Sequence, residues 1–248
     1  MVNTMNMPTL REMNNEYIGV IALTSYKKRI HYTGLTIFSL ICNCPRFHIV
    51  LTLSRSEFPK GIYDLPNDVQ LLIQNRLCEV CWVKNNFKTF KKIVYAQCKY
   101  KHLPVISADD GCIYTYNYAQ QLYNIWLQHT NNIISIKKFP DPQYSIGGGG
   151  YGVLYPPYCF RDIGLKIVEC FGYLLAKNPN DDRFIGILAS KMGIRYTFIS
   201  DIIGHDITTF IDVTKKDGLS ENGQYQGGFN KVFERIIDTV IQYEYNSK

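Results

Sequence analysis

The chain has 248 residues, of which 46% are hydrophobic, and a formal net charge of +6. This length and composition predict a folded chain with a substantial core and exclude an intrinsically disordered protein. The modest positive charge suits a phosphate-bearing ligand or an anionic membrane surface, and we expect no nucleic-acid partner.

Residues 1–16 are polar and rich in Asn, and we expect them to form a tail before one domain at residues 17–248. The tail has no apolar core of a secretory signal, and no stretch reaches the ~18 apolar residues that a membrane span requires. We therefore expect a cytoplasmic protein, in peripheral contact with the inner face of the membrane. Its eight cysteines should be reduced, and the pairs at 42/44 and 78/81 are predicted to be buried thiols rather than zinc ligands.

Apolar runs alternate with segments of helical spacing along the first half of the chain. Buried strands are predicted at residues 17–23, 48–53, 69–73 and 105–106, and helices at residues 32–42 and 84–99. This alternation predicts parallel strands joined by crossover helices. The second of these helices carries Lys88, Lys91 and Lys92 on one face, which we expect to be solvated or to contact an anionic membrane.

The second half continues with the same classes of element, without repeats or an interdomain linker. Helices are predicted at residues 116–128, 162–175, 181–192 and 229–243, and extended segments at residues 133–136 and 194–199. The fold class is therefore α/β, a single domain with a mostly parallel central sheet flanked by helices.

The apolar run Val105–Ile106 is followed shortly by two adjacent carboxylates, Asp109 and Asp110. In an open α/β sheet, ligands bind beyond the carboxyl ends of the strands. Adjacent carboxylates repel each other unless a cation lies between them, and Mg²⁺ or Mn²⁺ prefers such oxygen ligands. A metal site and a simple helix cap are both compatible with this pair.

The first predicted strand ends in a polar and basic loop that contains Thr24, Ser25, Tyr26 and Arg29. Hydroxyl groups, backbone donors and cationic side chains at this position can contact a nucleotide and its phosphates. A solvated basic turn is the alternative.

Residues 147–152 read GGGGYG, a run that cannot contribute packing and is costly to order. The run matches neither a GxxxxGK[ST] loop nor a GxGxxG turn. We interpret it as an active-site loop whose backbone approaches a sugar or an acceptor, with a plain flexible turn as the alternative.

Two further acidic residues, Asp181 and Asp182, follow Asn180 at the start of a predicted helix. Such residues usually cap the helix, but a carboxylate there could serve as a general base. The helix N-terminus is expected to favour its ionised form and so to lower its basicity. His205 comes after a late strand, where it could complete a metal or diphosphate site or be structural.

Four segments in this order resemble bacterial glycosyltransferases of the GT-A fold, of the kind encoded among polysaccharide and lipopolysaccharide assembly genes. They are IALTSYKKRI at residues 21–30, VISADDGCIY at 105–114, GGYGVLYPP at 149–157 and NDDRFI at 180–185. No single motif is highly specific, but the ordered set is, and the similarity spans roughly residues 17–199, most of the chain.

The resemblance implies a nucleotide-sugar half at about residues 17–114 and an acceptor half at about 115–248. Asp110, Asp109 and His205 would hold a divalent cation, Mn²⁺ or Mg²⁺, against the donor diphosphate. The loop from Thr24 to Arg29, together with Asp109, would bind the donor, most simply a UDP-sugar. One departure is Gly111, where this family usually has a third acidic residue, so Asp110 would have to serve as the main metal ligand, with Asp109 supporting it through the nucleotide ribose or the metal shell.

On the acceptor side, the resemblance implies that the segment with Gly149, Gly150, Tyr151 and Tyr155 borders a glycan or lipid-linked acceptor. It also places the catalytic base at the acidic pair, Asp182 or its neighbour. We expect hexosyl transfer with inversion. Two alternatives stay open, a metal-dependent nucleotidyl- or phosphotransferase and a degenerate nucleotide-sugar-binding protein without turnover.

Overall fold

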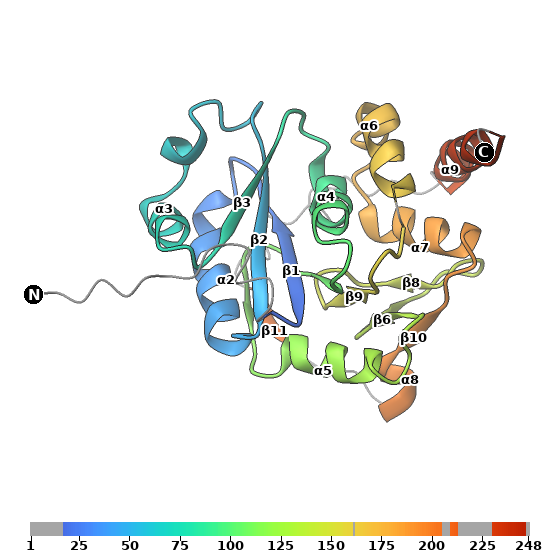
Figure 1. Ribbon diagram of the computed structural model, residues 1–248, viewed down its shortest axis with the longest axis horizontal. Coiled ribbons are helices and arrows are strands. Elements are labelled where there is room, and N and C mark those ends of the chain that lie inside the picture. The colour runs from blue at the N-terminus through green and yellow to red at the C-terminus, as the bar shows by residue number, and fades with distance from the viewer. Residues whose placement is uncertain (1–16, 161, 205–208, 213–229, 247–248) are drawn as a thin grey trace, which may run out of the picture.

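The computed structural model describes residues 17–160, 162–204, 209–212 and 230–246. A twisted central sheet runs through the molecule with helices on both of its faces (Figure 1). This is the α/β arrangement with a mostly parallel sheet that the sequence predicts. In the described part of the chain, no helix is long and apolar enough to cross a membrane.

The central sheet has seven strands, and only β9 runs antiparallel to its neighbours. Parallel strands β4, β1, β2 and β3 therefore end at one common edge, which we call the carboxyl edge. In spatial order the strands are β10 (Tyr196–Phe198), β6 (Ile133–Ser135), β9 (Val153–Tyr155), β4 (Val105–Ser107), β1 (Gly19–Thr24), β2 (Phe47–Ser54) and β3 (Glu79–Val83).

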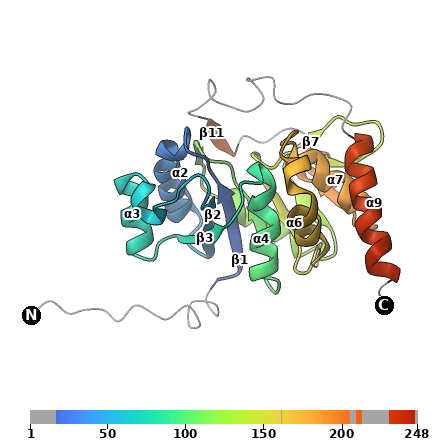
Figure 2. The same cartoon turned by 90° about the horizontal axis from the view of Figure 1, so that it is seen from above.

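Alternate side chains of β1 point to opposite faces of the sheet, as strand geometry requires. Ile21 and Leu23 pack beneath the helices α2 (Ile30–Asn43), α3 (Asn67–Gln74) and α5 (Tyr118–Trp126). Val20 and Ala22 face the other layer, where the helices are separated from the first layer by the sheet (Figure 2). That layer consists of α4 (Lys91–Lys99), α6 (Ile163–Leu175), α7 (Asp181–Lys191) and α9 (Asn230–Asn246).

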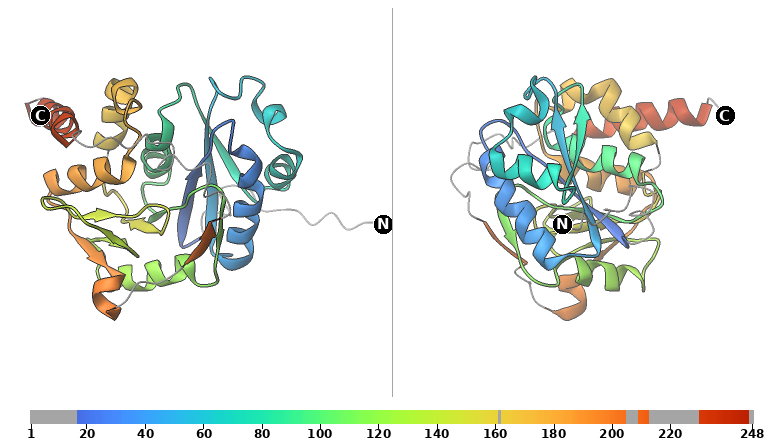
Figure 3. Two further views of the ribbon diagram at one scale, coloured as in Figure 1. Left: turned by 180° about the vertical axis from the view of Figure 1, so that it is seen from behind. Right: turned by 60° about the vertical axis from the view of Figure 1, so that its left-hand side comes forward.

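Two small antiparallel pairs accompany the main sheet, visible from the back of the molecule (Figure 3). One joins β5 (Cys112–Tyr114) to β11 (Phe210–Asp212), and the other joins β7 (Lys138–Phe139) to β8 (Ile146–Gly147). The remaining short elements are α8 (Ile199–Ile203), η1 (Gly61–Asp64) and η2 (Lys88–Phe90).

The predicted strand at residues 69–73 is wrong, because this segment forms helix α3. Its apolar residues Val69, Leu72 and Ile73 recur at helical spacing, but over only five residues this pattern resembles the continuous apolar run of a buried strand. The third parallel strand is instead β3, which contains Cys81 and is the outermost strand on one side of the sheet.

The predicted basic surface on the helix that follows is also wrong. Lys91 and Lys92 are buried, with 1% and 3% of their surface exposed, so they cannot contact a membrane. All eight cysteines are free. Cys44 and Cys78 are buried as predicted, whereas Cys42 is exposed.

Glu79 at the start of β3 forms a partly buried ionic cluster and should contribute to the acid stability of the protein. Burial opposes its ionisation, but contacts with His48, Lys99 and Tyr100 outweigh that cost and lower the pKa of Glu79 to about 2. Because the pKa of Glu79 is lowered in the folded state, its ionised form stabilises the fold at pH values above the ordinary pKa. This stabilisation is lost as the pH falls from about 4.5 towards 2.

We expect Glu79→Gln to lower the free energy of unfolding at neutral pH by about 1–2 kcal/mol, since solvent around the half-exposed Lys99 screens the interaction, and to flatten its dependence on pH in this range. Urea titrations at a series of pH values measure both effects. The exposed Asp201→Asn on α8 is the matched control, and an unchanged pH slope in Glu79→Gln would contradict the prediction.

Candidate functional site

Four segments meet at the carboxyl edge of the sheet. The parallel strands β1 and β4 end there, so Ser25 and the pair Asp109–Asp110 follow them directly. Because β9 is antiparallel, the glycine run that precedes it lies at the same edge. Contacts described below bring the start of α7, with Asp181 and Asp182, to this place as well.

Asp110 is buried and fully engaged by the first loop. Arg29 Nη2 lies 3.0 Å from Asp110 Oδ1 and donates a 2.6 Å hydrogen bond to its backbone carbonyl, while Ser25 Oγ donates to Oδ2 at 2.5 Å. Burial raises the pKa of Asp110 to about 6, although Arg29 and Ser25 oppose this change. Asp110 therefore ties the first loop to β4 and forms part of the wall of the site.

Asp109 points the other way and is accessible. Its side chain is 48% exposed, and Oδ1 accepts a 2.7 Å hydrogen bond from the Lys92 ammonium. Its backbone N–H donates to the hydroxyl of Tyr114 at 2.8 Å, which fixes the turn. Although burial opposes ionisation, Lys92 outweighs that cost and lowers the pKa of Asp109. The Asp109 carboxylate is thus ionised and open to a ligand.

The second acidic pair starts α7 in a well-capped turn. Asn180 Oδ1 accepts a 3.1 Å hydrogen bond from the N–H of Arg183, so Asn180 is the helix cap. Asp181 is buried, with Oδ2 3.6 Å from Lys92 Nζ, while Asp182 Oδ1 accepts a 3.0 Å hydrogen bond from the N–H of Gly149.

The pKa of Asp182 is shifted in the opposite direction from the one that its position at a helix N-terminus suggests. Burial, reinforced by repulsion from Asp181, raises the pKa of Asp182 well above its ordinary value. The sequence predicted the opposite direction, because a helix N-terminus stabilises a carboxylate. Desolvation outweighs that effect here, and it makes Asp182 a stronger base.

The glycine run is held in place rather than being a loose turn. Gly149 O accepts from Ser107 Oγ at 2.9 Å, and Gly150 O accepts from Tyr114 Oη at 3.1 Å. A Cβ at Gly149 would lie 2.6 Å from Asp182 Oδ1, and one at Gly150 would lie 2.6 Å from Asp109 Oδ2. A side chain at either position would therefore have to displace a carboxylate, because the backbone passes close to Asp182 at Gly149 and to Asp109 at Gly150.

Several predicted site residues lie elsewhere than in the opening of the site. Thr24 is buried and donates to Thr52 O at 2.7 Å, so its hydroxyl joins strands rather than facing a ligand. Tyr155 is 2% exposed and lies in the hydrophobic core, which removes it from any acceptor surface. Tyr26 and Tyr151 are partly exposed at the same edge, and His205 lies outside the described residues.

A divalent cation fits this site only in a limited way. Among the described residues, no group of three His, Cys, Asp or Glu side chains could hold a metal ion. Gly111 adopts φ 77°, a left-handed conformation in which a third acidic residue would be strained. Mg²⁺ nevertheless commonly binds through one or two carboxylates together with substrate phosphates and waters. Asp109, with its exposed carboxylate, suits that mode, whereas both oxygens of Asp110 are already engaged.

Sequence reasoning missed Lys92, Ser107 and Tyr114, which hold the site together. For Lys92 the helix predicted over residues 84–99 hid the signal. Helix α4 begins only at Lys91, so two lysines lie in its first turn, where they oppose the helix dipole unless carboxylates lie nearby. For Ser107 and Tyr114 no sequence signal distinguishes them from ordinary strand residues.

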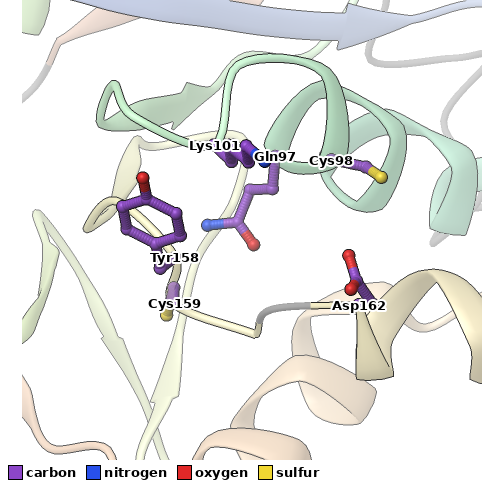
Figure 4. Close-up of a pocket in the computed structure, with 6 residues that line it drawn as sticks. All are labelled: Gln97, Cys98, Lys101, Tyr158, Cys159 and Asp162. Atoms are coloured by element: carbon purple, nitrogen blue, oxygen red, sulfur yellow. The ribbon is translucent and has the colours of Figure 1, made fainter.

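A separate pocket of about 190 Å³ lies away from this site (Figure 4). Its walls come from the end of α4 and from the segment after β9, and they include Gln97, Lys101, Tyr158 and Asp162. Since residues 97–101 lead into the beginning of β4, the pocket lies at the opposite edge of the sheet from Asp109. The acidic site and this pocket are therefore distinct.

No protein-family model matches this chain, and no curated protein matches it either. Among solved structures, the mannosyltransferase PcManGT from Pyrobaculum calidifontis, in complex with GDP-Man and Mn²⁺, is similar at 12% identity. Its TM-score is 0.47, with 89% of this chain and 68% of that chain covered. The glycosyltransferase GlyE of Streptococcus pneumoniae TIGR4 is similar at 12% identity and a TM-score of 0.45, with 94% of this chain and 64% of that chain covered. The chain thus spans about two thirds of the length of these proteins.

Proposed function

We propose that the chain is a glycosyltransferase that moves a hexosyl group from a nucleotide-sugar, such as a UDP-sugar, to a glycan or lipid-linked acceptor. The observation that carries the proposal is the pairing of an exposed, ionised Asp109 with a more basic Asp182 across the Gly149–Gly150 backbone. Such a pair divides the work that glycosyl transfer requires, which is binding the leaving group and deprotonating the acceptor.

Asp109 is the better candidate for the donor side of the site. Its exposed carboxylate could hold a divalent cation jointly with the donor phosphates, or accept a donor hydroxyl directly. When bound, such a cation would neutralise the negative charge that develops on the leaving nucleoside diphosphate. Asp110 would then hold the first loop against β4 without contacting the donor, because Arg29 and Ser25 already engage both of its carboxylate oxygens. This reverses the roles that the sequence suggested for the two residues.

Asp182 is proposed as the general base. The acceptor hydroxyl oxygen attacks the anomeric carbon, and the bond between that carbon and the diphosphate oxygen breaks. The bonding electrons leave with the nucleoside diphosphate, and the hydroxyl proton passes to Asp182. The raised pKa of Asp182 suits proton acceptance near neutral pH. We propose inversion, since a base that is separate from the donor carboxylate can activate the acceptor on the face opposite the leaving group.

A thermal-shift screen of nucleotide-sugars, with and without Mn²⁺, tests the donor part of the proposal. The panel includes UDP-sugars and GDP-mannose, and a true donor should raise the unfolding temperature. A ligand at 100 times its Kd stabilises the folded state by about 2.7 kcal/mol. Loss of the shift in Asp109→Asn would assign the binding to this site, whereas stabilisation by no nucleotide-sugar would contradict the proposal.

The glycine run offers a second test of the same geometry. Gly150→Ala should displace Asp109, because the added methyl would lie 2.6 Å from Oδ2. A shift on the order of 1 Å in a reacting group can cost ~10²-fold in rate. We therefore expect a transfer rate about 10²-fold lower, measured by release of nucleoside diphosphate.

The matched control is Gly164→Ala in α6, where a new Cβ would meet only ordinary contacts at 3.4 Å. This control should keep both rate and stability. If Gly150→Ala kept the normal rate, the close approach of Gly150 to Asp109 would not matter for transfer, and the prediction would be contradicted.

A further inference from the structure

Lys92 occupies a position that the reaction as described above does not use. It lies in the first turn of α4, and its side chain is only 4% exposed. Its ammonium lies 2.7 Å from Asp109 Oδ1 and 3.6 Å from Asp181 Oδ2. The two acidic residues belong to distant segments, the loop after β4 and the start of α7, and Lys92 is the cation that contacts both.

The contacts of Lys92 extend to the remaining members of the site. A Cβ at Gly149 would lie 3.6 Å from the Lys92 ammonium and 2.6 Å from Asp182 Oδ1, so the ammonium and this carboxylate flank the same backbone. Asp109, Asp181 and Asp182 all stabilise the charged form of Lys92 against the cost of burial and raise its pKa. One buried positive charge thus serves three carboxylates that would otherwise repel each other.

The neighbouring lysine shows that burial alone does not account for this arrangement. Lys91 is equally buried, with 1% exposed, yet its ammonium donates to Lys88 O at 2.9 Å and to Asn86 Oδ1 at 3.4 Å. Those groups belong to η2 and the residues before it, and Lys91 acts on Asp110 and Asp181 only through its charge and not through a hydrogen bond or ion pair. Two buried lysines in one helical turn therefore do different things, and only one of them joins the two acidic segments.

We propose that Lys92 is a positioning residue that sets the distance between the donor carboxylate Asp109 and the acidic pair at the start of α7. This inference rests on the proposed function and assigns to Lys92 the alignment of donor and acceptor. Without the ammonium, Asp109 keeps its exposure and can still bind a donor, but repulsion moves it away from Asp181. The donor would then bind out of line with the base.

Steady-state kinetics of Lys92→Met, with Lys91→Met as the matched control, test the proposal. Lys92→Met should lower kcat by about 10²-fold with little change in the KM for the nucleotide-sugar, because misalignment affects the reaction more than binding. Lys91→Met should keep both constants, although it also replaces a buried lysine. Ethylammonium added to Lys92→Ala should restore part of the lost kcat, because it returns a positive charge to the place between the carboxylates.

A crystal structure of Lys92→Met gives a readout that does not depend on turnover. We expect the carboxylates of Asp109 and Asp181 to lie farther apart than in the wild-type protein. Unmoved carboxylates, or a near-normal kcat in a folded Lys92→Met, would overturn the role of Lys92 and leave the proposed function standing. Wild-type protein that transfers no sugar would overturn the proposed function, and the position of the carboxylates would still decide whether Lys92 sets their distance.

Discussion

Asp182→Asn is expected to lower the transfer rate by ~10²–10⁴-fold, the range typical for loss of a general base. The substitution preserves the shape of the side chain, and the amide oxygen can still accept the hydrogen bond from the N–H of Gly149. The glycine run should therefore stay in place while proton acceptance is lost. Donor affinity should be unchanged, because Asp109 lies on the other side of this backbone.

The comparison with Asp181→Asn separates the base from its neighbour. Asp181 is buried against Lys92, so its loss should affect the rate through position rather than through proton transfer. If both variants turned over at near-normal rates, the acidic pair would be only a helix cap and the base would lie elsewhere.

The pH dependence of the wild-type rate gives an independent check on Asp182. A general base acts in its deprotonated form, so the rate should fall as the pH drops through the pKa of Asp182. Burial and Asp181 raise that pKa, and the loss should therefore occur above the ordinary carboxyl range near about 4. The residual activity of Asp182→Asn should lack this step in its pH–rate profile.

The second large effect should come from the other acidic pair, whose members are expected to behave differently. Asp109→Asn removes the exposed carboxylate, so the Mn²⁺-dependent affinity for the donor should fall by at least about 10-fold, measured by calorimetric titration. Asp110→Asn instead removes the buried carboxylate that pairs with Arg29, whose Nη2 lies 3.0 Å from Asp110 Oδ1. Breaking such a pair costs about 3–5 kcal/mol, so the main effect should be a lower free energy of unfolding.

This contrast distinguishes the structural assignment from the one that the sequence suggested. If Asp110→Asn folded normally and lost only metal-dependent affinity, Asp110 would face the ligand after all. Serine at position 25 provides the matched control, because Ser25→Ala removes one hydrogen bond to Asp110 and keeps the Arg29 ion pair. It should destabilise the protein less than Asp110→Asn does.

Much of the fold could be predicted because the spacing of apolar residues along the chain indicates most of its strands and helices. The run at residues 105–106 is buried strand β4, and the abrupt change to Asp109 marks its carboxyl end. The order of strands and helices then brings this end beside that of β1. The prediction of a strand at residues 69–73 was wrong because a short apolar run fits a helix or a strand equally well.

The chemistry of the site was harder to predict, because it depends on contacts between distant segments. Nothing in the pair Asp109–Asp110 shows which carboxylate meets Arg29 and which stays exposed. The pKa of Asp182 is raised by burial and by Asp181, and its carboxylate contacts the glycine run 33 residues away, none of which the local sequence shows. Lys92 was assigned to the surface because lysine is rarely buried, whereas the site requires its charge inside.

The most direct test of the proposed function is product analysis of one reaction, with a donor from the thermal-shift screen and a panel of acceptors. NMR of the mixture would measure the released nucleoside diphosphate and the new glycoside together. The account predicts equal amounts of both with wild-type protein and a loss of both with Asp182→Asn. Pyrophosphate or a phosphorylated product would contradict it in favour of attack at phosphorus. A donor that binds but is never consumed would contradict it in favour of a binding protein.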